Sequence, residues 1–364
     1  MKVELIGKTK VVMENKHGKN NYFAWPSVCV LKNGKIAVAA SGYRYEHICP
    51  FGKAVISYSE DEGETYTAPA PIIDTPLDDR DAGIVPFGEN GAVLTSFNNT
   101  VKFQRDVNKG RKNPYPIIES YLDTVTAEDE QKYLGSEYTV SHDNGVTFGE
   151  IYKSPITSPH GPMELHDGSV VWVGRTYTSN DTFIGEVDEV RAYKMDMNGG
   201  MEYLGSVPPI DKDGKRVLSC EPHAIELDDG TLLCHIRVQN DSGLFTVYQT
   251  TSADGGRKWT EPVQLLPDNG GSPAHILKHS SGVLVSTYGY RNMPFGVKVM
   301  FSTDNGRTWD TDHRIYENTV TGDLGYPCTV ELSDGSMLTV FYAHEKQGEP
   351  AVILQQKWRM TELR

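Results

Sequence analysis

A short motif recurs four times along the chain and constrains its fold more than any other feature. Each copy reads Ser-x-Asp-x-Gly-x-(Thr or Lys)-aromatic, and the copies begin at Ser59, Ser141, Ser252 and Ser302. Aspartate followed two residues later by glycine favours a tight turn, because the carboxylate accepts nearby backbone N–H groups and glycine tolerates a positive φ. The terminal aromatic residue is expected to anchor each turn on a sheet. A chain that repeats such a turn is predicted to repeat the surrounding strands.

A second pattern sets the number of repeats. Six segments combine an apolar strand, a polar turn rich in Asn, Asp, Ser and Gly, and another apolar strand. They are SVCVLKNGKIAVAAS, GIVPFGENGAVLTSF, PMELHDGSVVWVGR, HAIELDDGTLLCHIR, AHILKHSSGVLVSTY and CTVELSDGSMLTVFY. A degenerate turn at residues 196–200 stands where a motif copy is missing. Six evenly spaced units of this kind predict an all-β, six-bladed β-propeller with antiparallel four-stranded blades.

The repeat predicts one propeller domain over residues 1–364, in place of the two or three domains that length alone suggests. The last unit lacks a strand, which the segment VELIGKTKVVM near the start of the chain can supply to close the ring. Residues from about 99 to 134 break the period. This insertion is predicted to be a lid, a contact in a homo-oligomer, or a plain surface loop.

Charge and cysteine content exclude several classes of function. The 35 Lys and Arg against 49 Asp and Glu give a formal charge of −14, which disfavours nucleic acid as a partner. No stretch approaches the roughly 20 apolar residues of a membrane span, so no membrane partner is expected. Five cysteines without CxxC spacing and the lack of a secretory signal favour the cytoplasm, although a trimmed secreted protein would look the same. No motif indicates a metal or a cofactor.

Polar residues gather at the ends of the predicted inner hairpins, where the loops of a propeller form the mouth of its channel. Five arginines stand at these ends and are predicted to face one pocket: Arg44, Arg80, Arg175, Arg237 and Arg291. A planar guanidinium suits a carboxylate, so a ring of arginines favours an acidic sugar as ligand. Four further residues at these ends are predicted to contact it: Trp25, His160, His223 and His275.

The four turns on a six-unit all-β chain resemble the Asp boxes, or BNR repeats, of the sialidase (neuraminidase) superfamily, and the resemblance covers essentially the whole chain. Members of that family use a tyrosine nucleophile activated by a glutamate, an aspartate acid/base, and three arginines that hold the substrate carboxylate. Glu221, in Glu-Pro-His-Ala-Ile-Glu-Leu-Asp-Asp-Gly, resembles the family's glutamate, and Tyr326, in Gly-Tyr-Pro, resembles its nucleophile. Arg237 and Arg291 are placed like the second and third arginines.

Two positions depart from the family pattern. Where the first arginine is expected, the chain reads Ala-Trp25-Pro, and the loop after the first hairpin has no aspartate to serve as acid/base. The leaving group still needs a proton donor. Four residues near the blade ends are candidates: Asp81, Asp79, Glu46 and His47, with the Asp79–Asp81 cluster favoured.

The resulting prediction is an exo-acting glycoside hydrolase of carbohydrate metabolism that releases a terminal acidic sugar, sialic-acid-like or related. A phenol with a pKa near 10 needs a base beside it, and Glu221 facing Tyr326 would serve. One alternative is a propeller polysaccharide lyase, in which arginine neutralises a uronate carboxylate and Tyr or His removes the C5 proton. The other is a non-catalytic glycan-binding propeller that uses aromatic residues such as Trp25, Tyr43, Tyr288 and Tyr290.

Overall fold

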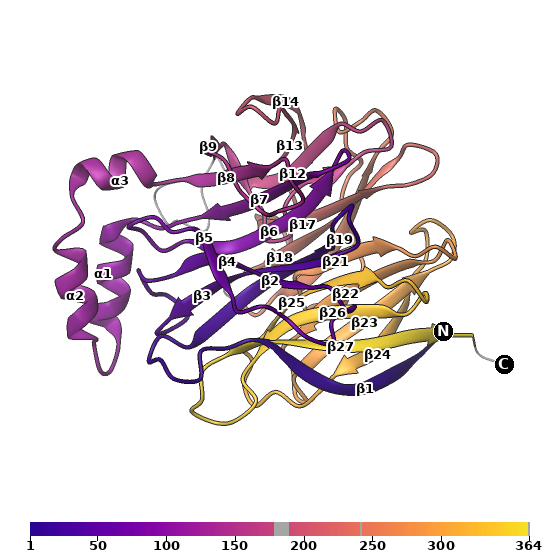
Figure 1. The fold of residues 1–364 in the computed structure, drawn as a ribbon. Helices are drawn as coiled ribbons and strands as arrows, with labels where there is room; N and C mark the ends of the chain where they lie inside the picture. The colour runs from indigo at the N-terminus through magenta and orange to yellow at the C-terminus, as the bar shows by residue number, and fades with distance from the viewer. Residues whose placement is uncertain (178–188, 241, 363–364) are drawn as a thin grey trace.

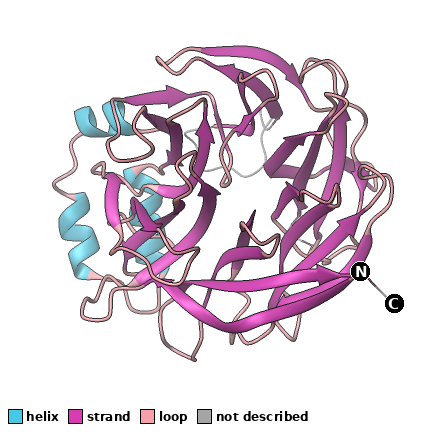
Figure 2. Cartoon of the chain, turned by 45° about the vertical axis from the view of Figure 1, so that its right-hand side comes forward, coloured by secondary structure: helices cyan, strands magenta, loops and turns pink. Residues whose placement is uncertain are grey.

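A computed structural model describes residues 1–177, 189–240 and 242–362. Its strands form six antiparallel sheets arranged as blades around a ring (Figures 1 and 2). This arrangement confirms the six-bladed, all-β propeller predicted from the repeat.

Each blade takes four consecutive strand positions from the ring centre outward. Blade 1 contains β2 (Tyr22–Val30), β3 (Ile36–Arg44), β4 (Lys53–Ser59) and β5 (Ala70–Ile73). Blade 2 contains β6 (Arg80–Phe87), β7 (Gly91–Phe97), β8 (Ser136–Ser141) and β9 (Ile151–Ser154). Blade 3 contains β10 (Ile156–Thr157), β11 (Met163–Glu164), β12 (Val170–Thr176), β13 (Val190–Met195) and β14 (Met201–Ser206). The short β10 and β11 pair with successive parts of β12 and share the innermost position.

The second half of the ring repeats this order. Blade 4 contains β17 (Leu218–Glu226), β18 (Leu232–Gln239), β19 (Phe245–Ser252) and β20 (Val263–Gln264). Blade 5 contains β21 (Ala274–Lys278), β22 (Leu284–Tyr290), β23 (Gly296–Ser302) and β24 (Asp310–Tyr316). Blade 6 contains β25 (Gly325–Glu331), β26 (Met337–Ala343), β27 (Val352–Thr361) and β1 (Lys2–Met13). A small hairpin, β15 (Asp211–Lys212) and β16 (Lys215–Arg216), lies between blades 3 and 4 in the chain.

The two ends of the described chain meet in blade 6. Strand β1 pairs antiparallel with β27, from Lys2 opposite Thr361 to Met13 opposite Ile353. The N-terminal segment therefore supplies the outer strand that the last unit lacks, as predicted, and closes the ring (Figure 1).

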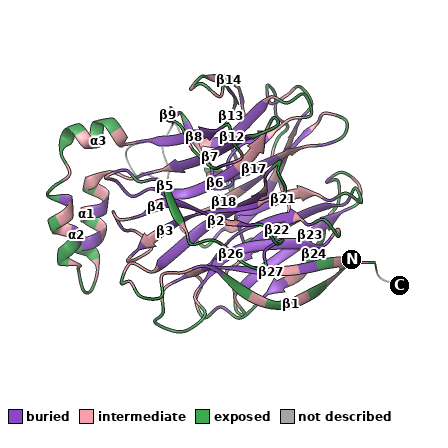
Figure 3. Cartoon of the chain, in the orientation of Figure 1, coloured by how far each residue is buried: buried purple, intermediate pink, exposed green. Residues whose placement is uncertain are grey.

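The core lies between neighbouring blades, because each sheet packs both faces against its neighbours. The middle strands of the blades, such as β3 and β26, are therefore buried along nearly their whole length. Strand β1 lies at the rim, and most of its residues are partly or fully exposed (Figure 3). Large rings such as Trp172, Trp358 and Phe341 fill these layers. Burial on two faces explains the near-continuous apolar runs in the sequence, in place of strict alternation.

The four Asp boxes form the turns between the third and fourth strands of blades 1, 2, 4 and 5. In the first copy, Asp61 Oδ1 accepts the backbone N–H of Thr65 at 2.8 Å, and the Ser59 hydroxyl accepts that of Gly63 at 2.8 Å. Gly63 has a φ of 82°, which explains why glycine stands there. The degenerate turn at 196–200 follows β13 and occupies the same place in blade 3.

The insertion folds as three short helices on one side of blade 2, α1 (Val101–Gly110), α2 (Pro116–Leu122) and α3 (Ala127–Tyr133) (Figure 2). Thr100 caps α1 by accepting the N–H of Phe103, and Thr126 with Asp129 forms a capping box at α3. These caps satisfy backbone groups that short helices leave unpaired. Within the described ranges, no helix is long and apolar enough to cross a membrane.

Candidate active site

Four inner strands each have a shift in their pairing register, and at each shift lies a residue other than glycine with a positive φ. Trp25, Asp81, Glu221 and Tyr326 have φ values of 53°, 48°, 48° and 48°. Each lies at a shift in the hydrogen-bonding register between its own strand and the neighbouring strand; the four strands are β2, β6, β17 and β25. A positive φ is costly for residues other than glycine, and bulges of this kind redirect side chains at functional sites. Three of the four line one cavity.

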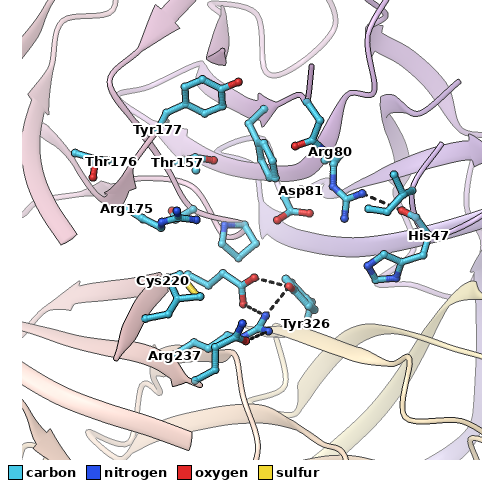
Figure 4. A pocket seen from close by; sticks show the side chains of 18 of the residues that line it. His47, Arg80, Asp81, Thr157, Arg175, Thr176, Tyr177, Cys220, Arg237 and Tyr326 are labelled. Carbon is cyan, nitrogen blue, oxygen red and sulfur yellow. Dashed lines mark hydrogen bonds and ion pairs between the residues drawn. The ribbon is translucent and has the colours of Figure 1, made fainter. Parts of the chain in front are cut away.

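This cavity has a volume of about 290 Å³ and lies where blades 1, 2, 3, 4 and 6 approach one another (Figure 4). Its polar wall includes His47, Arg80, Asp81, Arg175, Glu221, Arg237 and Tyr326. Apolar surface comes from Phe97 of β7, Phe103 of α1 and the ring of Tyr177. The mixture of charged groups and aromatic surface suits a small polar ligand.

Tyr326, Glu221 and Arg237 form a closed hydrogen-bonded triangle. The Tyr326 hydroxyl donates to Glu221 Oε1 at 2.5 Å. Arg237 Nη1 donates to Glu221 Oε2 at 2.6 Å and to the Tyr326 oxygen at 2.9 Å. The three residues come from β25, β17 and β18, so two blades must be placed correctly to make the triangle. Gln239 accepts from the second amino group of Arg237 and fixes the guanidinium.

The phenol of Tyr326 is neutral in this structure. Burial raises its pKa well above the ordinary value, the neighbouring Glu221 carboxylate raises it further, and Arg237 acts in the opposite direction. A neutral phenol is a weak nucleophile unless a base removes its proton during the reaction. Glu221 already accepts that proton in a short hydrogen bond, and Arg237 would stabilise the phenolate that results.

Asp81 faces this triangle from the blade 2 side of the cavity (Figure 4). Burial raises the pKa of Asp81 to about 7; Arg80 lowers it, and Glu221 adds to the rise. Its Oδ1 is buried and has no hydrogen-bond partner among the described residues. A carboxyl group with a pKa near neutrality can both donate and accept a proton.

The five arginines that were predicted to face one pocket divide into three groups. Arg80, Arg175 and Arg237 line the cavity. Arg291 lies beside it, with its guanidinium carbon 6.0 Å from the ring centre of Tyr326. Arg44 was expected in the same pocket, and this expectation is wrong: its side chain is completely buried in an ion pair with Asp78 at 2.5 Å.

Trp25 does not line the cavity either. It is 1% exposed, because the guanidinium of Arg80 lies over its ring at 4.0 Å from the centroid and that of Arg44 at 4.9 Å. The prediction that Trp25 contacts the ligand is therefore wrong for this structure. Its place in the molecule is beneath Arg80, which it supports from blade 1 through a cation–π contact.

Asp79 is not a candidate acid/base. It is fully buried and does not line the cavity; its carboxylate accepts the N–H of Thr75 at 2.7 Å and the hydroxyl of the same residue at 2.7 Å. Burial raises its pKa well above the ordinary value, and Glu137 contributes to the rise. The prediction that Asp79 takes part in the site is wrong, because these bonds turn its side chain into the blade.

His160, His223 and His275 lie together, but away from the triangle. They line a second cavity of about 340 Å³, among residues of the inner strands such as Ile225 and Val330. His223 and His275 stack with ring centres 4.2 Å apart, and His160 contacts both. The prediction that these histidines contact a ligand with Arg237 is wrong, because inner-strand residues beyond the bulges face a different part of the channel.

The helical insertion contributes to the site. Asn99 and Phe103 line the cavity. Tyr115 donates to Glu46 at 2.5 Å, and Gln104 donates to Asp78 at 2.7 Å, so the helices hold the loop after the first hairpin and the segment that leads into β6. Glu46 is thereby engaged with the insertion and does not line the cavity. The oligomer contact stays a prediction.

Asp323 is one of the residues near the site that the sequence did not indicate; Phe97, Asn99, Phe103 and Tyr177 of the cavity wall are others. Asp323 lies three residues before Tyr326 and accepts hydrogen bonds from Tyr22, Tyr342, His47 and His344. It belongs to no recurring motif, and only its nearness to Tyr326 in the sequence could have pointed to it. In the parts of the chain that the structure describes, no three His, Cys, Asp or Glu side chains are grouped as a metal site.

The fold is that of the sialidase-like β-propellers. Residues 124–340 match the BNR repeat-like domain, so the chain belongs to that family. No curated protein matches the chain in sequence.

Three solved structures illustrate what the fold is similar to. A Dyadobacter fermentans protein of unknown function is 20% identical, with a TM-score of 0.77 and 99% of both chains covered. The NanB sialidase of Streptococcus pneumoniae is 13% identical, with a TM-score of 0.67, 97% of this chain covered and 71% of that chain. A Trypanosoma rangeli sialidase is 14% identical, with a TM-score of 0.61, 98% of this chain covered and 58% of that chain. At these identities the likeness shows the fold.

Proposed function

We propose that this protein is an exo-acting glycoside hydrolase that releases a terminal acidic sugar and retains its anomeric configuration. The observation that carries the proposal is the triangle of Tyr326, Glu221 and Arg237, which faces Asp81 across a small cavity. The fold relatives that are described as sialidases support the reaction class.

In the first step, the Tyr326 oxygen attacks the anomeric carbon while Glu221 takes the phenolic proton. The bond to the leaving oxygen breaks, and Asp81 transfers its proton to that oxygen. Tyr326 suits this position because a neutral phenol adds no second negative charge to that of Glu221 before the sugar binds. The protonated form of Asp81 that the first step needs is present below a pH of about 7.

In the second step, the ionised Asp81 takes a proton from water, and the water oxygen displaces Tyr326 from the anomeric carbon. Glu221 returns the proton to the phenolate. Tyr326, Glu221 and Asp81 are then as they were at the start, and the sugar carries a new hydroxyl group on its original face. A pKa of about 7 allows Asp81 to serve as acid and then as base.

The sugar carboxylate binds to the arginines that line the cavity. Arg237 stands at the triangle, and Arg80 is held rigidly on the ring of Trp25. Trp25 stands at the position where sialidases carry their first arginine. Arg80 of blade 2 lies next to it and can bind the sugar carboxylate in place of that arginine. Planar guanidinium groups recognise carboxylates with strong hydrogen bonds.

The test is a panel of aryl glycosides that carry acidic or neutral sugars, assayed for phenol release. Hydrolysis of an acidic glycoside is expected, with Tyr326→Phe and Glu221→Gln each losing at least about a hundredfold in kcat. Binding of the substrate to Tyr326→Phe, measured by calorimetry, should persist because only one hydroxyl is removed. Unchanged turnover in both variants would overturn the proposal, and an unsaturated uronate product would show a lyase.

A further inference from the structure

The cluster around Asp323 borders the proposed active site, yet the hydrolytic mechanism does not use it. Its carboxylate accepts four hydrogen bonds from blades 1 and 6. The donors are Tyr22 at 2.7 Å, Tyr342 at 2.8 Å, His47 Nδ1 at 3.0 Å and His344 Nε2 at 3.1 Å. Four donors on one partly buried carboxylate fix its position closely.

His344 carries a positive charge in this cluster. Its Nδ1 lies 2.8 Å from the carbonyl oxygen of Glu349, and its Nε2 faces Asp323. Both partners are acceptors, so both ring nitrogens must donate, which makes the ring an imidazolium. Burial alone would lower the pKa of His344, but these two acceptors raise it. The charge of Asp323 is therefore balanced by His344.

His47 is in a different state. Partial burial lowers its pKa, and the cations of Arg80 and Arg44 lower it further, against the opposing effect of Asp323. The ring is therefore neutral near pH 7 and carries one proton. Burial works against ionisation of Asp323, but hydrogen bonds from His344, His47 and Tyr22 hold its pKa well below the ordinary range. Because an ionised carboxylate can only accept, the single proton of His47 must be on Nδ1.

The other nitrogen of His47 is available to a ligand. The residue lines the cavity, its side chain is 45% exposed, and no described residue forms a hydrogen bond to Nε2. The ring stands at 88° to that of Trp25, with the centres 4.8 Å apart, and this contact limits its rotation. Figure 4 shows it at the side of the cavity that also holds Arg80 and Tyr326.

We propose that Asp323 is a positioning residue, which holds His47 as the Nδ1–H tautomer so that Nε2 accepts a hydrogen bond from a hydroxyl group of the sugar. The identity of the ligand as a sugar rests on the proposed function, whereas the assignment of the His47 tautomer is independent of it. In this state Nε2 has no proton to give, which leaves Asp81 as the acid in the mechanism.

The first experiment measures the tautomer directly, by nitrogen-15 NMR of histidine-labelled protein at neutral pH. The chain has 11 histidines, and the His47 signals are assigned as those missing in His47→Gln. The wild type is expected to show a protonated Nδ1 and an unprotonated Nε2. Asp323→Leu, which leaves no carboxylate or amide oxygen beside Nδ1, should shift the ring toward the Nε2–H form. Tyr342→Phe, which removes one hydrogen bond to Asp323 but leaves the contact between Asp323 and His47, should keep the wild-type signals.

An Nε2–H or doubly protonated His47 in the wild type would overturn the inference. So would an Asp323→Leu variant with the wild-type tautomer. Cooperative unfolding of each variant, measured alongside, separates a change of tautomer from loss of the fold.

The second experiment compares KM with kcat on an acidic glycoside. Asp323→Leu and His47→Ala should raise KM about tenfold with kcat nearly unchanged, because one hydrogen bond to the bound sugar is lost. His47→Gln should recover part of the affinity, since its amide oxygen is also an acceptor. Unchanged KM in Asp323→Leu and His47→Ala would overturn the role of Nε2. If no glycoside is hydrolysed, the proposed function fails, while the NMR result still decides the role of Asp323.

Discussion

Replacing Asp81 with asparagine tests whether Asp81 is protonated near neutral pH, as a catalytic acid must be, and the test needs only measurements of folding stability. Burial raises the pKa of Asp81 from 3.8 to about 7, so between these pH values the folded protein binds a proton that the unfolded chain has released. Stability of the wild type therefore falls as the pH rises through this interval. The interval is about three pH units at about 1.4 kcal/mol each, which makes the full loss about 4 kcal/mol. Asparagine does not ionise and removes this loss.

The assay is urea unfolding of wild type and Asp81→Asn between about pH 4 and about pH 8, with refolding checked at each pH. The free energy of unfolding of the variant minus that of the wild type should rise by about 4 kcal/mol over this range and level off above about pH 7. Packing differences of asparagine shift the whole curve and leave its slope unchanged. Other buried acids, such as Asp79, are common to both proteins and cancel.

The matched control is Asp304→Asn in the last Asp box. Hydrogen bonds from Thr308 and Ser302 lower the pKa of Asp304 to about 2, so its contribution to stability is present above a pH of about 4 and is lost as the pH falls through about 2. The difference between this variant and wild type should thus be constant between about pH 4 and about pH 8. A flat or falling curve for Asp81→Asn would refute the argument that Asp81 is protonated near neutrality.

The remaining predictions concern catalysis and structure. The pH profile of kcat/KM should fall as the pH rises through about 7 for a glycoside with a poor leaving group, because Asp81 loses its proton, and this limb should vanish for a nitrophenyl leaving group. Arg44→Met should lower the free energy of unfolding by about 3 kcal/mol in urea titrations, because it leaves Asp78 buried without its main cation; a neutral effect would contradict the buried ion pair. Phe103→Ala should raise KM several-fold in steady-state assays, since α1 forms part of the cavity wall, and an unchanged KM would mean that the insertion does not contact the substrate.

The fold could be predicted because its signals repeat. The Asp boxes mark the same turn in four blades, and the six apolar hairpins mark the inner strands, so an error in one copy does not change the architecture. The closing strand followed from counting, since the last unit lacked one. The helices of 101–133 were missed because their capping residues, such as Thr100 and Thr126, make local bonds that a search for repeats does not detect.

The resemblance to the sialidase family indicated Tyr326, Glu221 and Arg237 as site residues, and the structure brings these three side chains into contact; their catalytic roles stay predictions. Glu221 and Arg237 come close because they lie at the two ends of one hairpin, whose pairing places Cys220 directly opposite Arg237. When the pairing of two neighbouring strands alone fixes where a side chain points, its position can be predicted from the sequence.

The choice between Asp79 and Asp81 was beyond the sequence, because a bulge decides it. A positive φ at Asp81 turns that carboxyl toward the cavity, whereas Thr75 captures Asp79 inside the blade. The same limit applies to Arg44, whose partner Asp78 comes from a different blade. The sequence shows which residues lie at the end of a blade and therefore near the mouth of the channel. Which of these side chains face the channel depends on hydrogen bonds and ion pairs with residues far away in the sequence.

Trapping of the covalent intermediate tests the central claim most directly. A fluorinated acidic glycoside with a good leaving group should form the glycosyl-enzyme quickly and release it slowly, so intact-mass measurement should show one added sugar per chain. Peptide mapping should place that sugar on Tyr326, and Tyr326→Phe should remain unmodified. An adduct on another residue, or turnover of the parent glycoside by Tyr326→Phe at the wild-type rate, would contradict Tyr326 as the nucleophile.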